Sequence, residues 1–187
     1  MSESELISRV RSGDLTAWES IMQEQQEAVF RLAYLFLGDA GEAEDVAQEV
    51  FIRAFRYINS FDSARALRPW LFGITANLAR NRRRSIGRYV YHLARMARLA
   101  PPDVIDPEQE TTRRAEAALL WKAVRCLSDE DQEIIYLRYF MEFSVEETAE
   151  TLSIAPGTVK SRLSRALERL RGVARKEFPM LRRTADE

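Results

Sequence analysis

The 187-residue sequence is poor in the residue types that build catalytic and metal centres, with one cysteine and one histidine. A single cysteine excludes a disulfide framework, and zinc sites need several Cys or His ligands. The motifs H-E-x-x-H and G-x-S-x-G and a glycine-rich phosphate loop are absent. We therefore expect no metal, no cofactor and no enzymatic activity. We expect Cys126, among apolar neighbours, to be a small core residue, and His92 to be a surface or partly packed residue.

Long apolar runs are also missing. No stretch approaches the length of a membrane span, and the polar start M-S-E-S-E-L-I-S-R lacks the apolar segment of a secretory signal. These absences predict a cytoplasmic protein that does not insert into a membrane. Convincing strand-like alternation is absent too, whereas helical periodicity dominates, so the predicted fold class is all-α.

Charge is balanced overall but unevenly distributed. The 28 Lys and Arg residues against 29 Asp and Glu residues give a formal net charge of -1. Basic residues concentrate in Arg53–Arg98 and Pro156–Arg183, and acidic residues in Asp39–Glu49, Asp103–Glu116 and Asp129–Glu150. Blocks of opposite sign suggest separate partners, with the basic blocks as candidate phosphate surfaces.

The apolar periodicity predicts a series of helices separated by one proline-rich break. The expected helices are Glu5–Arg11, a helix capped by Asp14, Ala28–Leu37, a helix from Asp39 to about Tyr57 with Glu42 completing a capping box, Arg68–Arg84, Ser85–Leu99, Arg113–Leu127 and Asp129–Tyr139. Ala100–Gln109 has three prolines and no Lys or Arg, so we expect a flexible, acidic linker there. The predicted organisation is two small helical domains, residues 1–98 and 113–187, joined by residues 99–112.

Ser144–Leu170 indicates a helix-turn-helix. Ser144 and Glu147 form a capping box, and Pro156 suits the first turn of a second helix. At about 100° per residue, that second helix places apolar side chains on one side and Thr158, Ser161, Arg162, Arg165 and Arg169 on the other. Hydroxyl and guanidinium groups can reach base edges in the major groove. The alternative is the solvated face of an ordinary amphipathic helix.

Two helices of the first domain carry further candidate surfaces. The helix from Asp39 has Asp45, Gln48, Glu49 and the aliphatic Ile52 on one side, which indicates a protein-docking face, although acids near a helix start also suit the helix dipole. In Arg68–Arg84, Trp70, Leu71, Ile74 and Leu78 should be core. We expect Phe72 to point away from them, beside Asn77, Arg80 and Arg83, where it could stack on a base; packing against another helix is the alternative.

The arrangement resembles bacterial sigma factors of the extracytoplasmic-function (ECF) type, which have only sigma regions 2 and 4. Glu42–Phe55 resembles region 2.2, Arg68–Asn81 resembles regions 2.3 and 2.4, and Leu127–Arg171 resembles region 4. The three motifs occur in the family's order and cover nearly the whole chain, apart from the linker and tail.

The resemblance implies a role for each surface. Asp45, Gln48, Glu49 and Ile52 would contact the clamp coiled coil of the RNA polymerase core, and region 4 would also grip the polymerase flap. The −10 element would be recognised and melted by Asn59, Ser60, Phe61, Phe72, Asn77, Arg80 and Arg83, with a flipped base held by the loop from Asn59. The −35 element would be read as duplex by Thr158, Lys160, Ser161, Arg162 and Arg165. The family also implies an anti-sigma factor as a partner.

Two positions depart from the family pattern. Gly73 stands where the family very often has Arg or another polar residue, and glycine costs about 1 kcal/mol in a helix interior. Ala155 stands where a serine often caps the recognition helix. We therefore expect no phosphate contact from either position.

The competing hypothesis is an ordinary helix-turn-helix regulator whose N-terminal helices form a sensor or dimer domain. Such a protein would bind a two-fold duplex site tightly by itself. The motifs Glu42–Phe55 and Arg68–Asn81 speak against it.

Overall fold

The computed structural model describes residues 2–97 and 112–177, which fold into eight α-helices and two short helical turns without any strand. The elements are α1 (Glu3–Arg11), α2 (Leu15–Leu37), α3 (Ala40–Tyr57), the 3-10 turn η1 (Ile58–Ser60), α4 (Leu67–Ala97), α5 (Thr112–Arg125), α6 (Asp129–Ile135), the π-helical turn η2 (Tyr136–Phe140), α7 (Val145–Leu152) and α8 (Pro156–Glu177). The predicted all-α class is confirmed. The predicted linker lies outside the described residues, except that Thr112 already belongs to α5.

Aspartates begin the first two long helices, as the sequence predicted. Asp14 accepts hydrogen bonds from the backbone N–H groups of Thr16 and Ala17 at 3.0 and 3.3 Å. Hydrogen bonds from the Thr16 side chain and from Arg9 lower the pKa of Asp14 to about 2. Asp39 caps α3 by accepting from the Glu42 N–H at 2.9 Å. The predicted capping box is only half formed, because the Glu42 carboxylate accepts a hydrogen bond from Arg82 of α4 and so joins two helices instead.

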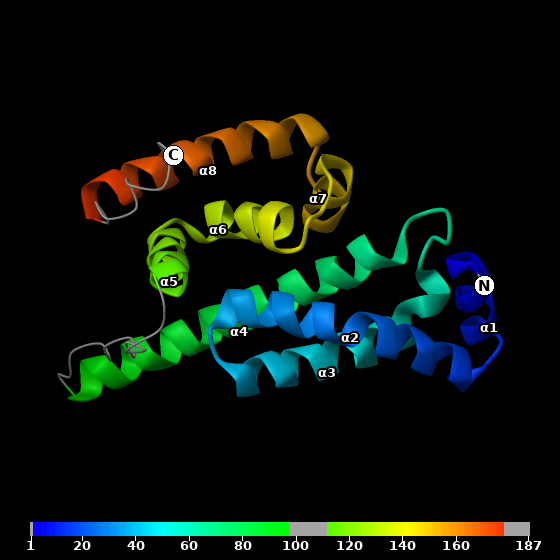
Figure 1. The fold of residues 1–187 in the computed structure, drawn as a ribbon. Helices are drawn as coiled ribbons and strands as arrows, with labels where there is room; N and C mark the ends of the chain where they lie inside the picture. The colour runs from blue at the N-terminus through cyan, green and yellow to red at the C-terminus, as the bar shows by residue number, and fades with distance from the viewer. Residues whose placement is uncertain (1, 98–111, 178–187) are drawn as a thin grey trace.

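Helices α2, α3 and α4 form a bundle, with α1 across one end (Figure 1). The buried residues recur at helical spacing, which makes each helix amphipathic. From α2 they include Val29, Leu32, Ala33, Leu35 and Phe36, and from α3 they include Val46, Val50, Phe51 and Ala54. Trp18 of α2 meets Phe51 of α3 edge to face, with ring centroids 6.2 Å apart. This bundle fixes the outward faces of α3 and α4.

Two helices are longer than the sequence suggested. The apolar segments at Trp18 and Ala28–Leu37 belong to the single helix α2, because the Gln and Glu residues between them are good helix formers. Likewise α4 continues from Leu67 to Ala97, which joins the expected helices Arg68–Arg84 and Ser85–Leu99. Gly87 lies within this helix without ending it, since one interior glycine costs only about 1 kcal/mol.

The helix-turn-helix is confirmed at the level of individual hydrogen bonds. Ser144 accepts from the Glu147 N–H at 3.0 Å, and Glu147 accepts from the Ser144 N–H at 2.7 Å. Ser153 ends α7 in the left-handed conformation with a φ of 55°. Pro156 then begins α8, where a missing N–H group costs no helical hydrogen bond. Before this unit, the helix capped by Ser128 runs as α6 and passes into η2.

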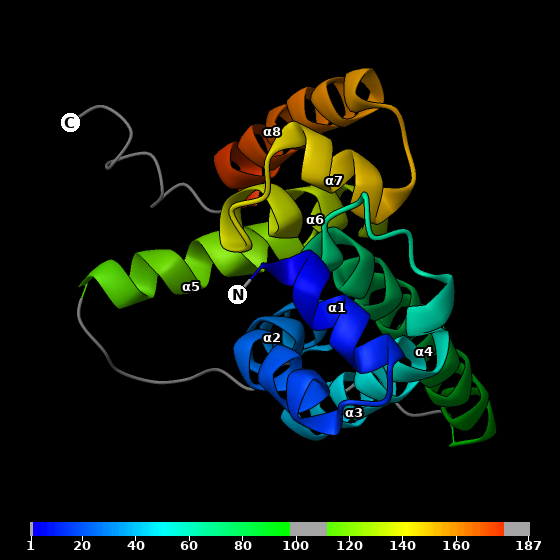
Figure 2. The same ribbon diagram turned by 90° about the vertical axis from the view of Figure 1, so that its right-hand side faces the viewer.

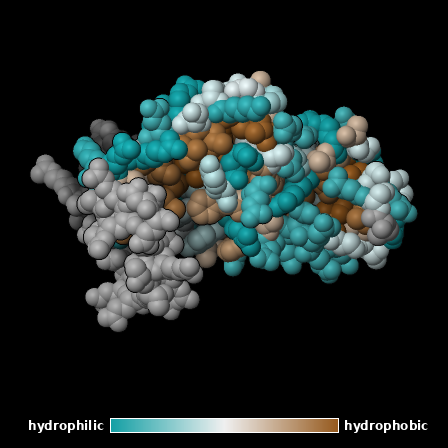
Figure 3. Space-filling view, turned by 45° about the horizontal axis from the view of Figure 1, so that its top comes forward, coloured by the Kyte–Doolittle hydropathy of each residue, from teal (hydrophilic) through white to brown (hydrophobic). Residues whose placement is uncertain are grey.

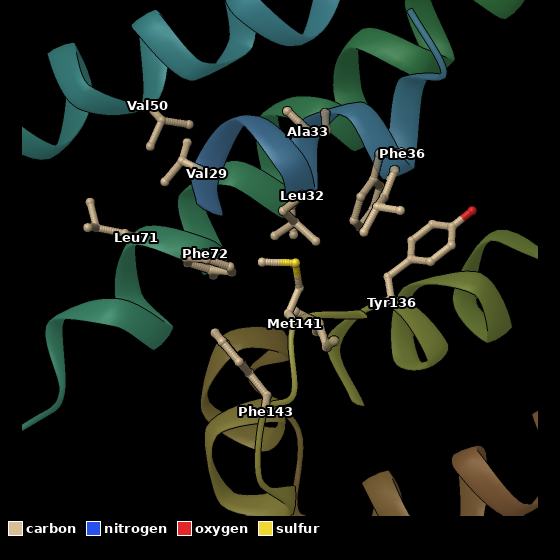
Figure 4. Packing of buried hydrophobic residues seen from close by; sticks show 14 of the residues in the cluster. Val29, Leu32, Ala33, Phe36, Val50, Leu71, Phe72, Tyr136, Met141 and Phe143 are labelled. Carbon is tan, nitrogen blue, oxygen red and sulfur yellow. The ribbon is translucent and has the colours of Figure 1, made fainter. Parts of the chain in front are cut away.

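The two sets of helices pack directly on each other. Figures 1 and 2 show α6 and α7 lying between α8 and α4. Buried residues of both sets form one hydrophobic cluster. In Figure 4, Phe72 of α4 lies close to Phe143, and Met141 extends toward Leu32 of α2. Phe36 of α2 also meets Tyr136, with ring centroids 5.7 Å apart. The core therefore continues from one predicted domain into the other.

Candidate functional site

Helix α8 presents the polar face that the sequence predicted. Its Val159 and Ala166 are fully buried, which anchors the opposite side against α6 and α7. The predicted reading residues are all partly or fully exposed: Thr158, Lys160, Ser161, Arg162 and Arg165. Figure 3 brings the α8 side forward and shows hydrophilic residues over most of this face, with apolar residues between them.

The two arginines in this reading set are available for an external partner. Among residues 2–97 and 112–177, the Arg165 side chain donates only to the Ser161 carbonyl of its own helix, from Nε at 3.2 Å. The Arg162 guanidinium lies 3.8 Å from the Glu130 carboxylate, at the outer limit of an ion pair. A hydroxyl and two guanidinium groups on an exposed helix face can donate to base edges and phosphates.

Arg169, which the sequence placed on the same outer face, has a structural partner. Its guanidinium contacts the Asp131 carboxylate of α6 at 2.6 and 2.8 Å. Asp131 is buried, and a buried carboxylate needs such a partner. Arg169 therefore joins α8 to α6.

The predicted docking residues form a contiguous surface on α3. Gln48 is exposed, Ile52 is 54 % exposed, and the Asp45 side chain is 67 % exposed. Glu49 forms an ion pair with Arg53 at 2.6 Å on the same helix. The exposed Ile52 side chain lies among the carboxylates of Asp45 and Glu49 and the amide of Gln48. This surface of α3 is therefore both apolar and acidic.

An apolar groove between α2 and α3 adjoins this surface, and the sequence analysis did not find it. Its volume is about 1130 Å³, and its lining includes Gln48 and Ile52. Leu15 and Phe55 in its walls are 60 % and 42 % exposed. Both residues continue the apolar sides of their helices beyond the buried core. The sequence feature that could have predicted this groove is the number of apolar residues on each helix, which exceeds what one buried side needs.

The loop after α3 is held at its base while its polar tip is exposed. Asn59 and Ser60 are exposed, whereas Phe61 is buried against Trp70 with ring centroids 4.7 Å apart. Arg11 of α1 donates to the Ile58 carbonyl at 3.1 Å and also to the Phe61 carbonyl. The amide and hydroxyl are therefore accessible, but the Phe61 ring is not.

The predicted base-stacking position of Phe72 is wrong for this structure. Phe72 is fully buried and packs against Phe143 with ring centroids 4.9 Å apart, so the alternative of packing against another segment holds. The reason is that the C-terminal helices cover this side of α4, which spacing within α4 could not reveal. Of the expected core residues, Leu71 is fully buried and Trp70, Ile74 and Leu78 pack around the core.

The polar residues beside Phe72 also have partners. Asn77 accepts from Arg80 at 3.0 Å, and Arg80 forms an ion pair with Glu133 of α6 at 2.7 Å. Arg83 contacts the Asp129 carboxylate at 2.9 Å. The structure thus brings the predicted α4 residues together on one face, and that face is covered by α6.

Comparison with known proteins gives matches to two family models. The Sigma-70 region 2 model matches residues 21–89, and the Sigma-70, region 4 model matches residues 117–170. Together these matches cover more than half of the sequence. The chain belongs to the ECF sigma factors of the sigma-70 family. Region 2 thus spans most of α2 through α4, and region 4 spans α5 through most of α8.

Relatives of this sigma factor match over most of their length. The ECF RNA polymerase sigma factor SigW of Bacillus subtilis is 34% identical over 88% of this chain and 92% of its own. The RNA polymerase sigma-H factor of Pseudomonas aeruginosa is 31% identical over 89% and 90%. Among solved structures, the sigma factor RpoE of Bartonella quintana, in complex with the anti-sigma factor NepR, matches with a TM-score of 0.65 and 28% identity over 85% of this chain and 97% of that chain.

His92 and Cys126 are the remaining candidate residues of the sequence. No cluster of potential metal ligands occurs among residues 2–97 and 112–177, and no helix in these ranges is long and apolar enough to cross a membrane. His92 falls in α4, but its side chain lies outside the described residues. The expectation for Cys126 is wrong: it is exposed at the end of α5, and partial burial and nearby Glu177 raise the pKa of its thiol.

Proposed function

We propose that the chain directs RNA polymerase to specific promoters and initiates transcription there, without being an enzyme itself. The carrying observation is the polar face of α8, in a chain that matches both sigma regions. On this face Ser161 and Arg165 are exposed and Thr158 is partly exposed, while Val159 and Ala166 on the opposite side are buried. Residues 1–98 would act as region 2, residues 99–112 as a linker and residues 113–187 as region 4. The protein would work in the cytoplasm beside the polymerase.

The surface on α3 would dock on the polymerase core. Asp45, Gln48, Glu49 and Ile52 offer carboxylates around an apolar patch, which suits a helical partner with basic and apolar side chains. The adjoining α2–α3 groove enlarges that patch. A polymerase clamp coiled coil is the proposed partner, and region 4 would contact the flap.

The −35 and −10 elements would be recognised by different chemistry. On α8, Thr158, Lys160, Ser161, Arg162 and Arg165 would read duplex DNA in the major groove. On α4 and the preceding loop, Asn59, Ser60, Asn77, Arg80 and Arg83 would hold the melted −10 strand. The rings of Phe61 and Phe72 are buried in this structure, so no DNA contact is assigned to them. Flipping a base costs a few kcal/mol of unstacking, which the amide, hydroxyl and guanidinium contacts would have to offset.

Promoter-specific run-off transcription tests this function. The cognate promoter is first selected from a genomic library. Purified core polymerase should initiate transcription at this promoter when this protein is present, and should not initiate there without it. An anti-sigma factor, also proposed as a partner, should abolish the signal. The alternative is a helix-turn-helix regulator that works by itself, and it predicts tight binding to a two-fold duplex site without polymerase. Such binding, together with no increase in promoter-specific initiation, would reject the proposal.

The docking assignment has its own test. Asp45→Lys with Glu49→Lys should weaken core binding at least tenfold, because like charges across an interface cost several kcal/mol. Binding of labelled protein to core polymerase measures this effect. Glu19→Lys with Glu24→Lys on exposed positions of α2 makes the same charge change away from the surface and should leave the affinity within about twofold. Equal losses in both variants would reject the assignment.

A further inference from the structure

Arg11 of α1 holds two backbone carbonyls of the α3–α4 loop, which is the segment of residues 58–66 (Figure 1). Its guanidinium donates to the Ile58 carbonyl at 3.1 Å and also to the Phe61 carbonyl. Arginine suits this task because its planar group presents several donors in one rigid fork. The two exposed residues between these carbonyls form the polar tip of the loop. One side chain therefore fixes the backbone on both sides of the tip.

The rest of the α3–α4 loop is held at a turn and at its exit. The Asp62 carboxylate accepts from the Ala64 N–H at 3.0 Å, and the Asp62 carbonyl accepts from the Arg65 N–H at 3.0 Å. Leu67 begins α4, and its N–H donates to the Glu3 carboxylate of α1 at 2.8 Å. The first N–H groups of a helix have no acceptor within that helix, so Glu3 supplies one of them. Helix α1 thus binds the loop at its entry and at its exit.

Helix α1 is itself fixed to the helical bundle. Ile7 and Val10 are buried in the common core, and α1 packs on α2 and on η1. Arg9 forms an ion pair with Asp14 at 2.7 Å across the corner between α1 and α2. All of α1 precedes residues 21–89, which the Sigma-70 region 2 model matches. The support of the loop therefore comes from a helix outside the matched region.

We infer that Arg11 and Glu3 are positioning residues for −10 recognition. They hold the α3–α4 loop in the conformation that binds a base, so that the exposed Asn59 amide and Ser60 hydroxyl are in place before DNA arrives. Ordering a loop on binding costs free energy, and a loop that is already ordered avoids this cost. The identity of the bound base rests on the proposed function, whereas the support of the loop by α1 does not.

Hydrogen exchange in the free full-length protein tests the support of the loop. Arg11→Ala should speed exchange of the loop amides by about tenfold or more, because the loop can then open locally. Glu3→Ala should do so mainly at Leu67, and Glu3→Gln, which keeps an acceptor oxygen, should restore the protection. Unchanged loop exchange in Arg11→Ala would overturn the inference. The amides that report on the loop are those of Phe61, Ala64, Arg65 and Leu67.

Val29→Ala is the control for a loss of stability alone. Val29 is fully buried in α2 and lies beside Val50 of α3 in Figure 4. Its truncation removes core packing and none of the hydrogen bonds to the loop. The variant should therefore unfold at a lower urea concentration than the natural protein, while exchange of the loop amides under native conditions stays within about twofold.

The second measurement is base selectivity in the assembled holoenzyme. Run-off transcription from promoters with a randomised −10 element and a fixed −35 element gives the preference for each base at each position. Arg11→Ala should lower this preference by about threefold or more at the position that the loop reads, and should leave the −35 preference unchanged. Val29→Ala should keep the −10 preference of the natural protein. An equal loss in Val29→Ala would overturn the inference, because any loss of stability would then have the same effect.

Arg11→Lys separates positioning from charge. The ammonium group keeps the positive charge but lacks the planar fork, so loop exchange should stay fast and the −10 preference low. Full −10 preference with fast loop exchange in Arg11→Lys would overturn the inference, because the charge alone would then be sufficient. A low preference with slow exchange in Arg11→Ala would overturn it as well. If the natural protein shows no −10 preference, the proposed function is rejected, and the exchange measurement still decides whether α1 supports the loop.

Discussion

Arg165 and Arg169 lie one helical turn apart on α8 but have different partners. The Arg165 guanidinium donates to the Ser161 carbonyl of its own helix, whereas Arg169 holds the buried Asp131 carboxylate at 2.6 Å. Spacing along the helix placed both on the outer face. Their functions separate only when the position of α6 is known, because the partner of Arg169 comes from that helix.

This difference predicts a separation of stability from DNA binding. Arg169→Ala should lower the free energy of unfolding by about 1–3 kcal/mol, the cost of leaving a buried carboxylate without its partner. Arg165→Ala should change that free energy by less than about 0.5 kcal/mol, yet weaken −35 binding by about 1–3 kcal/mol. Urea unfolding and holoenzyme binding to promoter duplex measure the two quantities. Equal effects of both variants on unfolding would contradict the assignment.

Asp14 predicts a pH dependence at the start of α2. Because its folded pKa is about 2, below the ordinary value of 3.8, the ionised form is favoured in the folded protein. Its stabilising contribution is therefore complete above pH 4 and is lost as the pH falls toward 2. Asp14→Asn should remove that part of the acid dependence, as measured by urea unfolding at several pH values. The prediction would be contradicted if the difference in unfolding free energy between Asp14→Asn and the natural protein stayed the same between pH 4 and pH 2.

At the scale of elements, α7 depends on a short local motif. Ser144 and Glu147 exchange hydrogen bonds at 3.0 and 2.7 Å across the first turn. Ser144→Ala should cost about 1 kcal/mol of unfolding free energy, because the Glu147 N–H in the first turn loses its acceptor. Ser164→Ala in the exposed middle of α8 is a matched control and should be neutral or slightly stabilising. Equal unfolding midpoints for the two variants would show that the capping box does not stabilise α7.

Features that depend on residues close together in the sequence could be predicted, whereas features that depend on distant residues could not. The caps at Asp14, Ser128 and Ser144 and the start of α8 at Pro156 were correct, since each depends on residues within one helical turn. The exposed α3 surface was also correct, because one helix carries it. The position of Phe72 was not predictable, since it depends on contact with Phe143, 71 residues later in the chain. The α2–α3 groove was missed for the same reason.

At the scale of the whole molecule, the three proposed surfaces differ in accessibility. The α3 docking surface and the α8 reading face are exposed, whereas the α4 surface is covered by α6 and α7. A polymerase can therefore reach the α3 docking surface without any rearrangement of the helices.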